Sequence, residues 1–303
     1  MGRTTTLKRR PQTELIPYST LFSRQSGNTQ IPYSTPFSRQ SGNTPIASNI
    51  PPPFCRQGNK YPMREEIIRL IPPDHKVYVE PFVGSGAIFY NKPPADETIL
   101  NDLDEDTYQQ HRILKIAPVT PRSYPTGLDN IPAIKQFYAK TPKTVAEKLI
   151  HAKIESCNGF SGSPVSASYG IYRKANPVKI LKHIHHYKSR LNRNTRILNQ
   201  DYGEVVRKYD SVDAFFFFDP PYENTRSIYG YGEHKGFDFD RLLDVLKGIR
   251  GRFLMTINDS PRIRKLFGEF TVVPTKVYAR WSRKTKRANA RKELIIMNYS
   301  VAG

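Results

Sequence analysis

The chain has 303 residues and a formal net charge of +20 at pH 7, enough for one large domain or a domain with a sub-domain and a tail. This positive excess favours a polyanionic partner, with nucleic acid ahead of an acidic membrane surface; a merely basic protein is the alternative. The apolar runs are too short for a membrane span, and the N-terminus lacks the apolar core of a signal peptide. The two cysteines, Cys55 and Cys157, are expected to form neither a zinc motif nor a disulfide framework, which suits a reducing compartment.

Residues 1–53 are predicted to be a disordered tail. Within them the stretch IPYSTLFSRQSGNTQ at 16–30 is followed at once by IPYSTPFSRQSGNTP at 31–45, a tandem repeat of 15 residues. Two polar copies rich in Ser, Thr, Gln, Asn and Pro cannot bury a core or build a solenoid. The basic TLKRRP near the start is either a phosphate-binding or import signal, or simply a solvated charge cluster.

From residue 57 onward, helical and strand patterns alternate. Their order is helix 63–73, strand and glycine turn with a following helix 76–91, strand 97–106, helices 144–155 and 177–191, strands 195–202 and 214–222, helix 240–249, strand 252–259, helix 260–270 and strand 293–300. This alternation predicts an α/β fold, a mostly parallel sheet with helices on both faces. Ligands of such sheets bind at the carboxyl ends of the strands, where the polar residues are therefore of most interest.

The first strand end carries a glycine turn. Gly84 and Gly86 allow close backbone approach to a ligand, but the turn is not GxGxxG, and a plain strand-to-helix turn is the alternative. An acid about twenty residues further on is placed to accept hydrogen bonds from ribose hydroxyls. Asp102 fits this role best, with Asp104 as the second choice; the alternative is that these acids only cap the next helix.

A third strand ends at Asp201 and Tyr202. The carboxylate is placed to accept from an adenine amino group while the tyrosine packs on the ring, although an Asp-Tyr pair after a strand is also an ordinary turn.

The stretch AFFFFDPPY at 214–222 passes abruptly from large apolar residues to an acid, two prolines and a tyrosine. Four phenylalanines predict a central strand buried on both faces, which leaves Asp219 at the mouth of the sheet. Pro220 and Pro221 fix φ and remove two backbone donors, so nearby carbonyls stay available as acceptors. Acceptors beside the flat face of Tyr222 suit a planar base with an exocyclic NH2, whereas the alternative is a proline turn after a buried strand.

The glycine turn EPFVGSG followed much later by DPPY resembles the Dam-like adenine-specific DNA methyltransferases, the alpha group of amino-methyltransferases. The segments RQGNKYPMREEIIRLIP, SCNGFSG, YGIYRK, LMTINDSPRIRKLF and ARKELIIMNY are similar to further elements of that family, so the likeness covers about residues 56 to 300. It implies a Rossmann-like S-adenosylmethionine-dependent methyltransferase sheet at 54–110 and 196–303. A mostly helical target-recognition sub-domain is expected as an insertion at 111–195.

Carried over residue by residue, the resemblance implies two groups of site residues. Those that would contact S-adenosyl-L-methionine are Lys60, Phe82, Gly84, Gly86, Asp102, Asp201 and Tyr202. Those that would hold and stack the flipped target base are Asp219, Pro220, Pro221 and Tyr222. The chain departs from the family at the opening motif, which reads Gly58-Asn59-Lys60 with Arg56 in the place of an aromatic residue, and its middle region is shorter.

Three basic regions are candidates for DNA contact. After the DPPY quartet, Arg226 and Tyr229 lie in a glycine-containing segment that is either a lid or an ordinary surface loop. Residues 115–195 add further lysines and arginines, and three nearby histidines, at 183, 185 and 186, belong to a solvated basic helix rather than to a metal site. The third region is a basic hairpin, whose alternative is a solvated face, with Arg280, Arg283, Lys284, Lys286 and Arg287.

The resemblance implies a site-specific DNA adenine-N6 methyltransferase that acts on a flipped base in duplex DNA without a covalent nucleophile or a metal. The alternatives are a cytosine-N4 DNA methyltransferase and an inactive nucleic-acid-binding relative. Expected partners are double-stranded DNA and a cognate restriction nuclease, with a monomer away from DNA and no membrane. The expected location is the cytoplasm or nucleoid of a prokaryote, or the nucleus or viral factory if the source is a eukaryotic virus, and not outside the cell.

Overall fold

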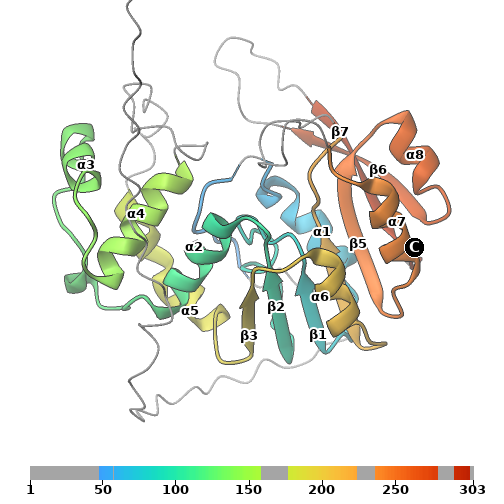
Figure 1. Cartoon of the computed structure of the whole chain (residues 1–303), viewed down its shortest axis with the longest axis horizontal. Helices are drawn as coiled ribbons and strands as arrows, with labels where there is room; N and C mark the ends of the chain where they lie inside the picture. The colour runs from blue at the N-terminus through green and yellow to red at the C-terminus, as the bar shows by residue number, and fades with distance from the viewer. Residues whose placement is uncertain (1–47, 57, 158–176, 224–235, 279–289, 301–303) are drawn as a thin grey trace, which may run out of the picture. The chain divides into compact units, whose positions relative to one another are not determined.

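The structure is a computed structural model, which describes residues 48–56, 58–157, 177–223, 236–278 and 290–300 (Figure 1). The chain divides into two units, Met1–Ser41 and Gly42–Gly303, and every described residue belongs to the second. The tandem repeat of the predicted tail lies outside the described residues. Within the described part of the chain, no helix is long and apolar enough to cross a membrane.

Seven strands form one sheet in the order β3-β2-β1-β4-β5-β7-β6. The first five strands are parallel, and β7 runs antiparallel to both of its neighbours. The predicted α/β fold with a mostly parallel sheet is confirmed. The strands are β1 (Val77–Glu80), β2 (Glu97–Asn101), β3 (Thr195–Leu198), β4 (Ala214–Phe218), β5 (Arg252–Asn258), β6 (Thr271–Tyr278) and β7 (Ala290–Met297).

The strand order reverses between β1 and β4, which are neighbours at the centre of the sheet with Val77 opposite Ala214. From β1 the chain proceeds outward through β2 to β3, and from β4 it proceeds to β5 on the other side. Loops that leave two adjacent strands in opposite directions open a crevice between them, and such a switch point is where open α/β sheets bind ligands. The glycine turn follows β1 and the DPPY segment follows β4, so both lie at this point.

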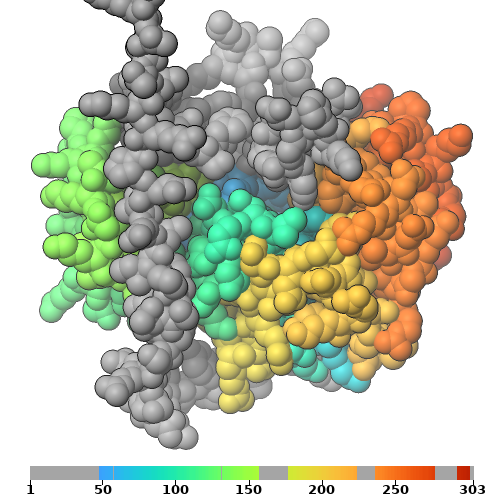
Figure 2. Space-filling view, viewed as in Figure 1, coloured from blue at the N-terminus to red at the C-terminus, as the bar shows by residue number. Residues whose placement is uncertain are grey.

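Helices cover both faces of the sheet, and the four phenylalanines of β4 alternate between the two hydrophobic cores. Phe215 and Phe217 belong to a core that also contains residues of α1 (Arg64–Leu70), α2 (Glu105–Ile116), α3 (Ile131–Tyr138), α4 (Val145–Cys157) and α5 (Ile184–Arg190). Phe216 and Phe218 pack on the other face with α6 (Tyr202–Tyr209), α7 (Phe239–Lys247) and α8 (Pro261–Leu266). Figure 2 shows α6 and α7 side by side on the viewed surface. A strand buried on both faces needs no alternation of polar residues, which explains the unbroken apolar run.

Several elements differ from the sequence-based expectations. The segment after the glycine turn is a series of turns rather than a helix, because Pro93 and Pro94 follow too soon for a helix to extend. The predicted helix at 177–191 is split into a 3₁₀ helix, Pro177–His183, and α5. The further short 3₁₀ helices are Tyr61–Met63 and Pro121–Ser123. Strand β6, which was not predicted, contains Pro274, a residue that an edge strand tolerates.

The end of the predicted tail is tied to the domain. The Ile50 amide donates to the Asn91 side chain at 2.8 Å, and the Pro53 carbonyl accepts from the buried Lys153 ammonium at 2.6 Å. Residues 48–53 are therefore part of the ordered unit. Cys55 is disulfide-bonded, so the expectation that the cysteines form no disulfide was wrong; the side chain of Cys157, the other cysteine of the sequence, lies outside the described residues.

Candidate active site

Asp219 stands directly after β4, and two side chains from distant parts of the chain hold its carboxylate. The Lys60 ammonium, which is only 4% exposed, lies 2.6 Å from Asp219 Oδ1. The Thr256 hydroxyl, on the neighbouring strand β5, donates to the same oxygen at 3.1 Å. Within the described ranges both contacts therefore fall on Oδ1. The other carboxylate oxygen remains available on a side chain that is about one-fifth exposed.

The rest of the DPPY segment is built around this carboxylate. Pro220 and Pro221 are buried, and within the described part of the chain the Pro220 carbonyl accepts no hydrogen bond. Lys60 Nζ lies 4.8 Å from the centre of the Tyr222 ring, so the ammonium lies near both the acid and the aromatic face. The segment is held in place at Glu223, whose amide donates to Asn258 Oδ1 at 3.0 Å. Asp219 and Tyr222 thus lie on either side of two buried prolines, with Lys60 close to both.

Burial raises the pKa of Asp219 above the ordinary value of a carboxyl group, while the charge of Lys60 and the hydrogen bonds from Lys60 and Thr256 oppose the rise. The pKa is still raised, so burial is the larger effect. An ionised carboxylate at this position depends on the ammonium beside it.

The glycine turn after β1 is fixed by a buried histidine that the sequence did not single out. His111 Nε2 donates to the Gly84 carbonyl at 2.9 Å, and the Tyr90 hydroxyl donates to His111 Nδ1 at 3.0 Å. Burial lowers the pKa of His111 to about 4, so the ring is neutral at pH 7 and acts as donor and acceptor together. Its only sequence signal is a histidine within an amphipathic helix, which more often marks an ordinary core position.

Asp102 closes the same turn from β2. Its two oxygens accept from the Gly84 amide at 2.9 Å and from the Asp104 amide at 3.0 Å. Burial raises the pKa of Asp102 to about 6, with both amides opposing the rise. Asp104 instead caps α2 through the Thr107 amide and pairs with Arg56 at 2.8 Å, as in the alternative considered for these acids.

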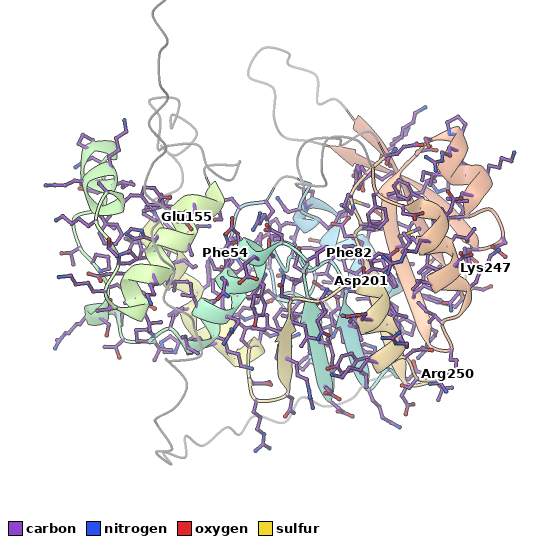
Figure 3. All side chains as sticks on the ribbon, in the orientation of Figure 1. Phe54, Phe82, Glu155, Asp201, Lys247 and Arg250 are labelled. Carbon is purple, nitrogen blue, oxygen red and sulfur yellow. The ribbon has the colours of Figure 1, made fainter. Side chains whose placement is uncertain are left out.

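Asp201 and Tyr202 follow β3 and so lie at the same end of the sheet, where the strands have their carboxyl ends. They have a partner that the sequence did not predict. Asp201 caps α6 and forms two bonds with Arg241, at 2.5 and 2.9 Å, while the Arg241 guanidinium lies 4.7 Å from the Tyr202 ring centre. Phe82 packs 5.3 Å from Tyr202 between ring centres, and Phe237 lies 5.8 Å from both. Figure 3 shows Phe82 and Asp201 above the sheet, at the end opposite Arg250.

The two glycines of the turn should respond differently to alanine, although both have positive φ, +47° at Gly84 and +68° at Gly86. A Cβ at Gly84 meets no atom within 4 Å, whereas one at Gly86 lies 2.7 Å from the buried Tyr90 ring. We expect Gly84→Ala to lower the free energy of unfolding by about 1 kcal/mol from backbone strain. Gly86→Ala should lower it by about 3 kcal/mol because overpacking is added. Urea denaturation of both variants checks this, and equal losses would contradict the packing seen at Gly86.

Most of the side chains that were expected to contact DNA lie outside the residues that the structure describes. Arg226, Tyr229 and the basic residues Arg280, Arg283, Lys284, Lys286 and Arg287 lie outside the described residues. Among the basic residues of 115–195 that were expected to contact DNA, Lys179 and Lys182 are exposed, but Arg190 is buried and donates to the Phe89 carbonyl at 3.0 Å. Arg190 is therefore a structural residue and not a surface contact. Among the described residues, no group of three His, Cys, Asp or Glu side chains is arranged to hold a metal ion.

Comparison with known protein families shows to which family the chain belongs. The model of the D12 class N6 adenine-specific DNA methyltransferases matches residues 57–283, most of the chain and all the side chains described at this edge except those before residue 57. The chain belongs to this family. The methyltransferase thus acts on the exocyclic N6 of adenine in DNA, and neither cytosine N4 transfer nor an inactive relative gains support.

Individual proteins agree with the family. The methyltransferase is 24% identical over 270 residues to "Type II methyltransferase M1.LlaDCHI" of Lactococcus lactis, covering 80% of this chain and 93% of that protein. It is 28% identical over 266 residues to "Type II methyltransferase M.MjaIII" of Methanocaldococcus jannaschii, covering 74% and 89%. It is also 27% identical over 255 residues to the "DNA N-6-adenine-methyltransferase" of Escherichia phage P1, covering 76% of this chain but 32% of that larger protein.

Proposed function

We propose that this methyltransferase takes its methyl group from S-adenosyl-L-methionine bound where β1, β2 and β3 end. The residues fit such a group: the open space beside Gly84, the Asp102 carboxylate and the aromatic faces of Phe82 and Tyr202 meet there. The cofactor supplies an electrophilic sulfonium methyl group. Gly84 and Gly86 shape the turn against its methionine end, Asp102 accepts from its ribose, and Asp201 and Tyr202 border its adenine, with Arg241 holding the last two in place. Lys60 completes the pocket from the DPPY side.

The acceptor amine is proposed to bind between the Asp219 carboxylate and the Pro220 carbonyl. An exocyclic amine of adenine is a poor nucleophile because its lone pair is delocalised into the ring. Two acceptors on its two hydrogens, the carboxylate of Asp219 and the Pro220 carbonyl, favour a pyramidal nitrogen and stabilise its developing positive charge. Tyr222 stacks on the base, which offsets part of the few kcal/mol that flipping costs.

The observation that carries this assignment is the contact of Lys60 with Asp219 at 2.6 Å. An ammonium nitrogen already occupies one oxygen of the carboxylate at the mouth of the sheet, so this acid is positioned to receive N–H donors. Within the described ranges its second oxygen accepts from no donor and the carbonyl of the next residue, Pro220, accepts no hydrogen bond, so two acceptors are available for an NH2 group with two hydrogens.

DNA is proposed to lie across the same edge. Strands β6 and β7 pair up to Tyr278 and Ala290, and Glu293 of β7 lies opposite Asn258 at the carboxyl end of β5. Strand β6 therefore ends and strand β7 begins near the catalytic residues, and the sequence between these two strands contains Arg280, Arg283, Lys284, Lys286 and Arg287. Its charges suit phosphate contacts. Arg226 and Tyr229 are proposed to act near the flipped base, and residues 111–195 to read the target sequence.

The proposal extends to partners and location. A cognate restriction nuclease is supported by the type II names of two relatives. We further propose a monomer away from DNA, and a location where DNA is found: the cytoplasm or nucleoid of a prokaryote, or the nucleus or viral factory of a virus-infected eukaryote.

Digestion of treated duplex DNA to nucleosides, followed by mass spectrometry, tests the proposal. With S-adenosylmethionine labelled in its methyl group, we expect labelled N6-methyladenosine and no labelled N4-methylcytidine, both as deoxynucleosides. Omission of the cofactor should abolish the product. Label on cytosine, or product formed from another methyl donor, would overturn the proposal.

A further inference from the structure

We infer that Thr256 is a positioning residue for transfer: its hydroxyl fixes the rotation of the Asp219 carboxylate so that Oδ2 faces the target amine. This inference rests on the proposed role of Asp219. Nothing in the family comparison or in the sequence patterns assigns a role to Thr256, which lies in the middle of an apolar strand.

The geometry separates the two oxygens of the carboxylate. Lys60 Nζ and Thr256 Oγ1 approach Oδ1 from different elements, at 2.6 and 3.1 Å. A carboxylate that accepts only from the Lys60 ammonium can still rotate about its Cβ–Cγ bond. A second donor on a rigid strand removes that freedom and leaves Oδ2 pointing away from both donors. Oriented acceptors that need no rearrangement during reaction are what electrostatic preorganisation requires.

Thr256 is suited to this task because β5 is paired with β4 in the centre of the sheet. Its side chain is fully buried, and Phe217 pairs with Leu254 and Phe218 with Met255 in the ladder just before it. Its hydroxyl also lies 3.5 Å from the Phe218 carbonyl, a longer contact than the one to Asp219, so the carboxylate is the better acceptor for its single proton. Two residues further on, Asn258 holds the Glu223 amide, so β5 fixes both ends of the DPPY segment.

A hydroxyl that donates to a carboxylate also stabilises the ionised form, and this hydrogen bond opposes the raised pKa of Asp219. The inference therefore predicts two linked changes when only the hydroxyl is lost. The chemical step slows, and the acid limb of the pH–rate profile moves to higher pH because Asp219 takes up its proton more readily.

Thr256→Val removes the hydroxyl and keeps the shape, and Thr256→Ser keeps the hydroxyl and loses a methyl group. With the full chain and a duplex substrate, we expect Thr256→Val to lower kcat about tenfold, as for loss of one hydrogen bond to a charged group, with the KM values for DNA and cofactor unchanged. The acid limb of its pH–rate profile should move to higher pH. Thr256→Ser should have the kcat and the acid-limb position of the wild type. Thr98→Val, the same change at a buried threonine of β2, serves as the control and should match the wild type.

Either of two results would overturn the inference: a Thr256→Val enzyme with the wild-type kcat and acid limb, or a Thr256→Ser enzyme as slow as Thr256→Val, which would indicate packing instead. Asp219→Asn, measured in parallel, distinguishes failure of this inference from failure of the proposed function. An inactive Asp219→Asn enzyme beside an unaffected Thr256→Val enzyme rejects only the role of Thr256. An active Asp219→Asn enzyme rejects the proposed role of Asp219 and the role of Thr256 with it.

Discussion

Replacement of Asp219 by alanine is expected to lower kcat by about 10³-fold or more while the cofactor still binds. The carboxylate is one of only two acceptors proposed for the amine, and without it neither the geometry nor the charge of the nitrogen is supported. Apart from Lys60, the proposed cofactor residues lie at the ends of other strands, so isothermal titration with S-adenosylmethionine should give a Kd close to that of the wild type. Turnover is measured by incorporation of labelled methyl groups into a duplex substrate.

The alanine variant also leaves the Lys60 ammonium buried without its partner, which destabilises the protein on its own account. Asp219→Asn is the control for this effect, since the amide oxygen still accepts from Lys60 while the negative charge is lost. We expect it to unfold at nearly the wild-type temperature and to be almost as slow as the alanine variant. Near-normal turnover in either variant would exclude Asp219 as the group that holds the amine.

Replacement of Lys60 by methionine is expected to move the acid limb of the pH–rate profile to higher pH and to lower turnover at neutral pH by at least about tenfold. Lys60 lowers the pKa of Asp219, which burial raises. Without the ammonium the pKa rises further, and activity requires the ionised carboxylate. Activity is therefore retained above that pKa and lost as the pH falls through it. Methionine fills the buried space of the lysine stem without its charge.

Lys76→Met provides the matched control. Lys76 also pairs with an aspartate, Asp213 at 2.9 Å, but its side chain is 63% exposed. Lys76 directly precedes β1 and so lies at the amino end of that strand, opposite the proposed active site. Its profile should match the wild type. If Lys60→Met and wild type share one acid limb, then Lys60 does not govern the ionisation of Asp219. A weaker cofactor affinity of Lys60→Met, measured separately by titration, reports on its proposed contact with S-adenosylmethionine.

The fold could be predicted from sequence wherever a pattern was local. The apolar run of β4 and the alternation of strands with helices specified a parallel sheet, because burial on both faces leaves a clear hydrophobic signal. Strand β6 was missed because an edge strand is half exposed and contains Pro274. The helix expected after Gly86 was wrong because two prolines end the segment after only a few turns.

The candidate site was predictable only in part, because only the residues that follow strands have a local sequence signal. Asp219 and Asp102 follow strands and were found from their positions, since parallel strands bring their carboxyl ends to one edge. Arg241, by contrast, meets Asp201 only because α7 packs beside α6, and no spacing in the sequence encodes that contact. Thr256 and His111 are single polar residues within otherwise ordinary elements, and only the folded chain shows what each one touches.

The chain order of the central strands also bears on how the enzyme is made. Strand β1 leaves the ribosome early, yet one of its two neighbours in the sheet, β4, is synthesised only after β2, β3 and the helices α2 to α6. Pairing across so long a separation is slow and leaves early strands exposed meanwhile. Lys60 is translated long before Asp219 and Thr256, so a nascent or truncated chain that stops before β5 holds only fragments of the reaction centre. The reaction centre is therefore complete only once β5 has been synthesised.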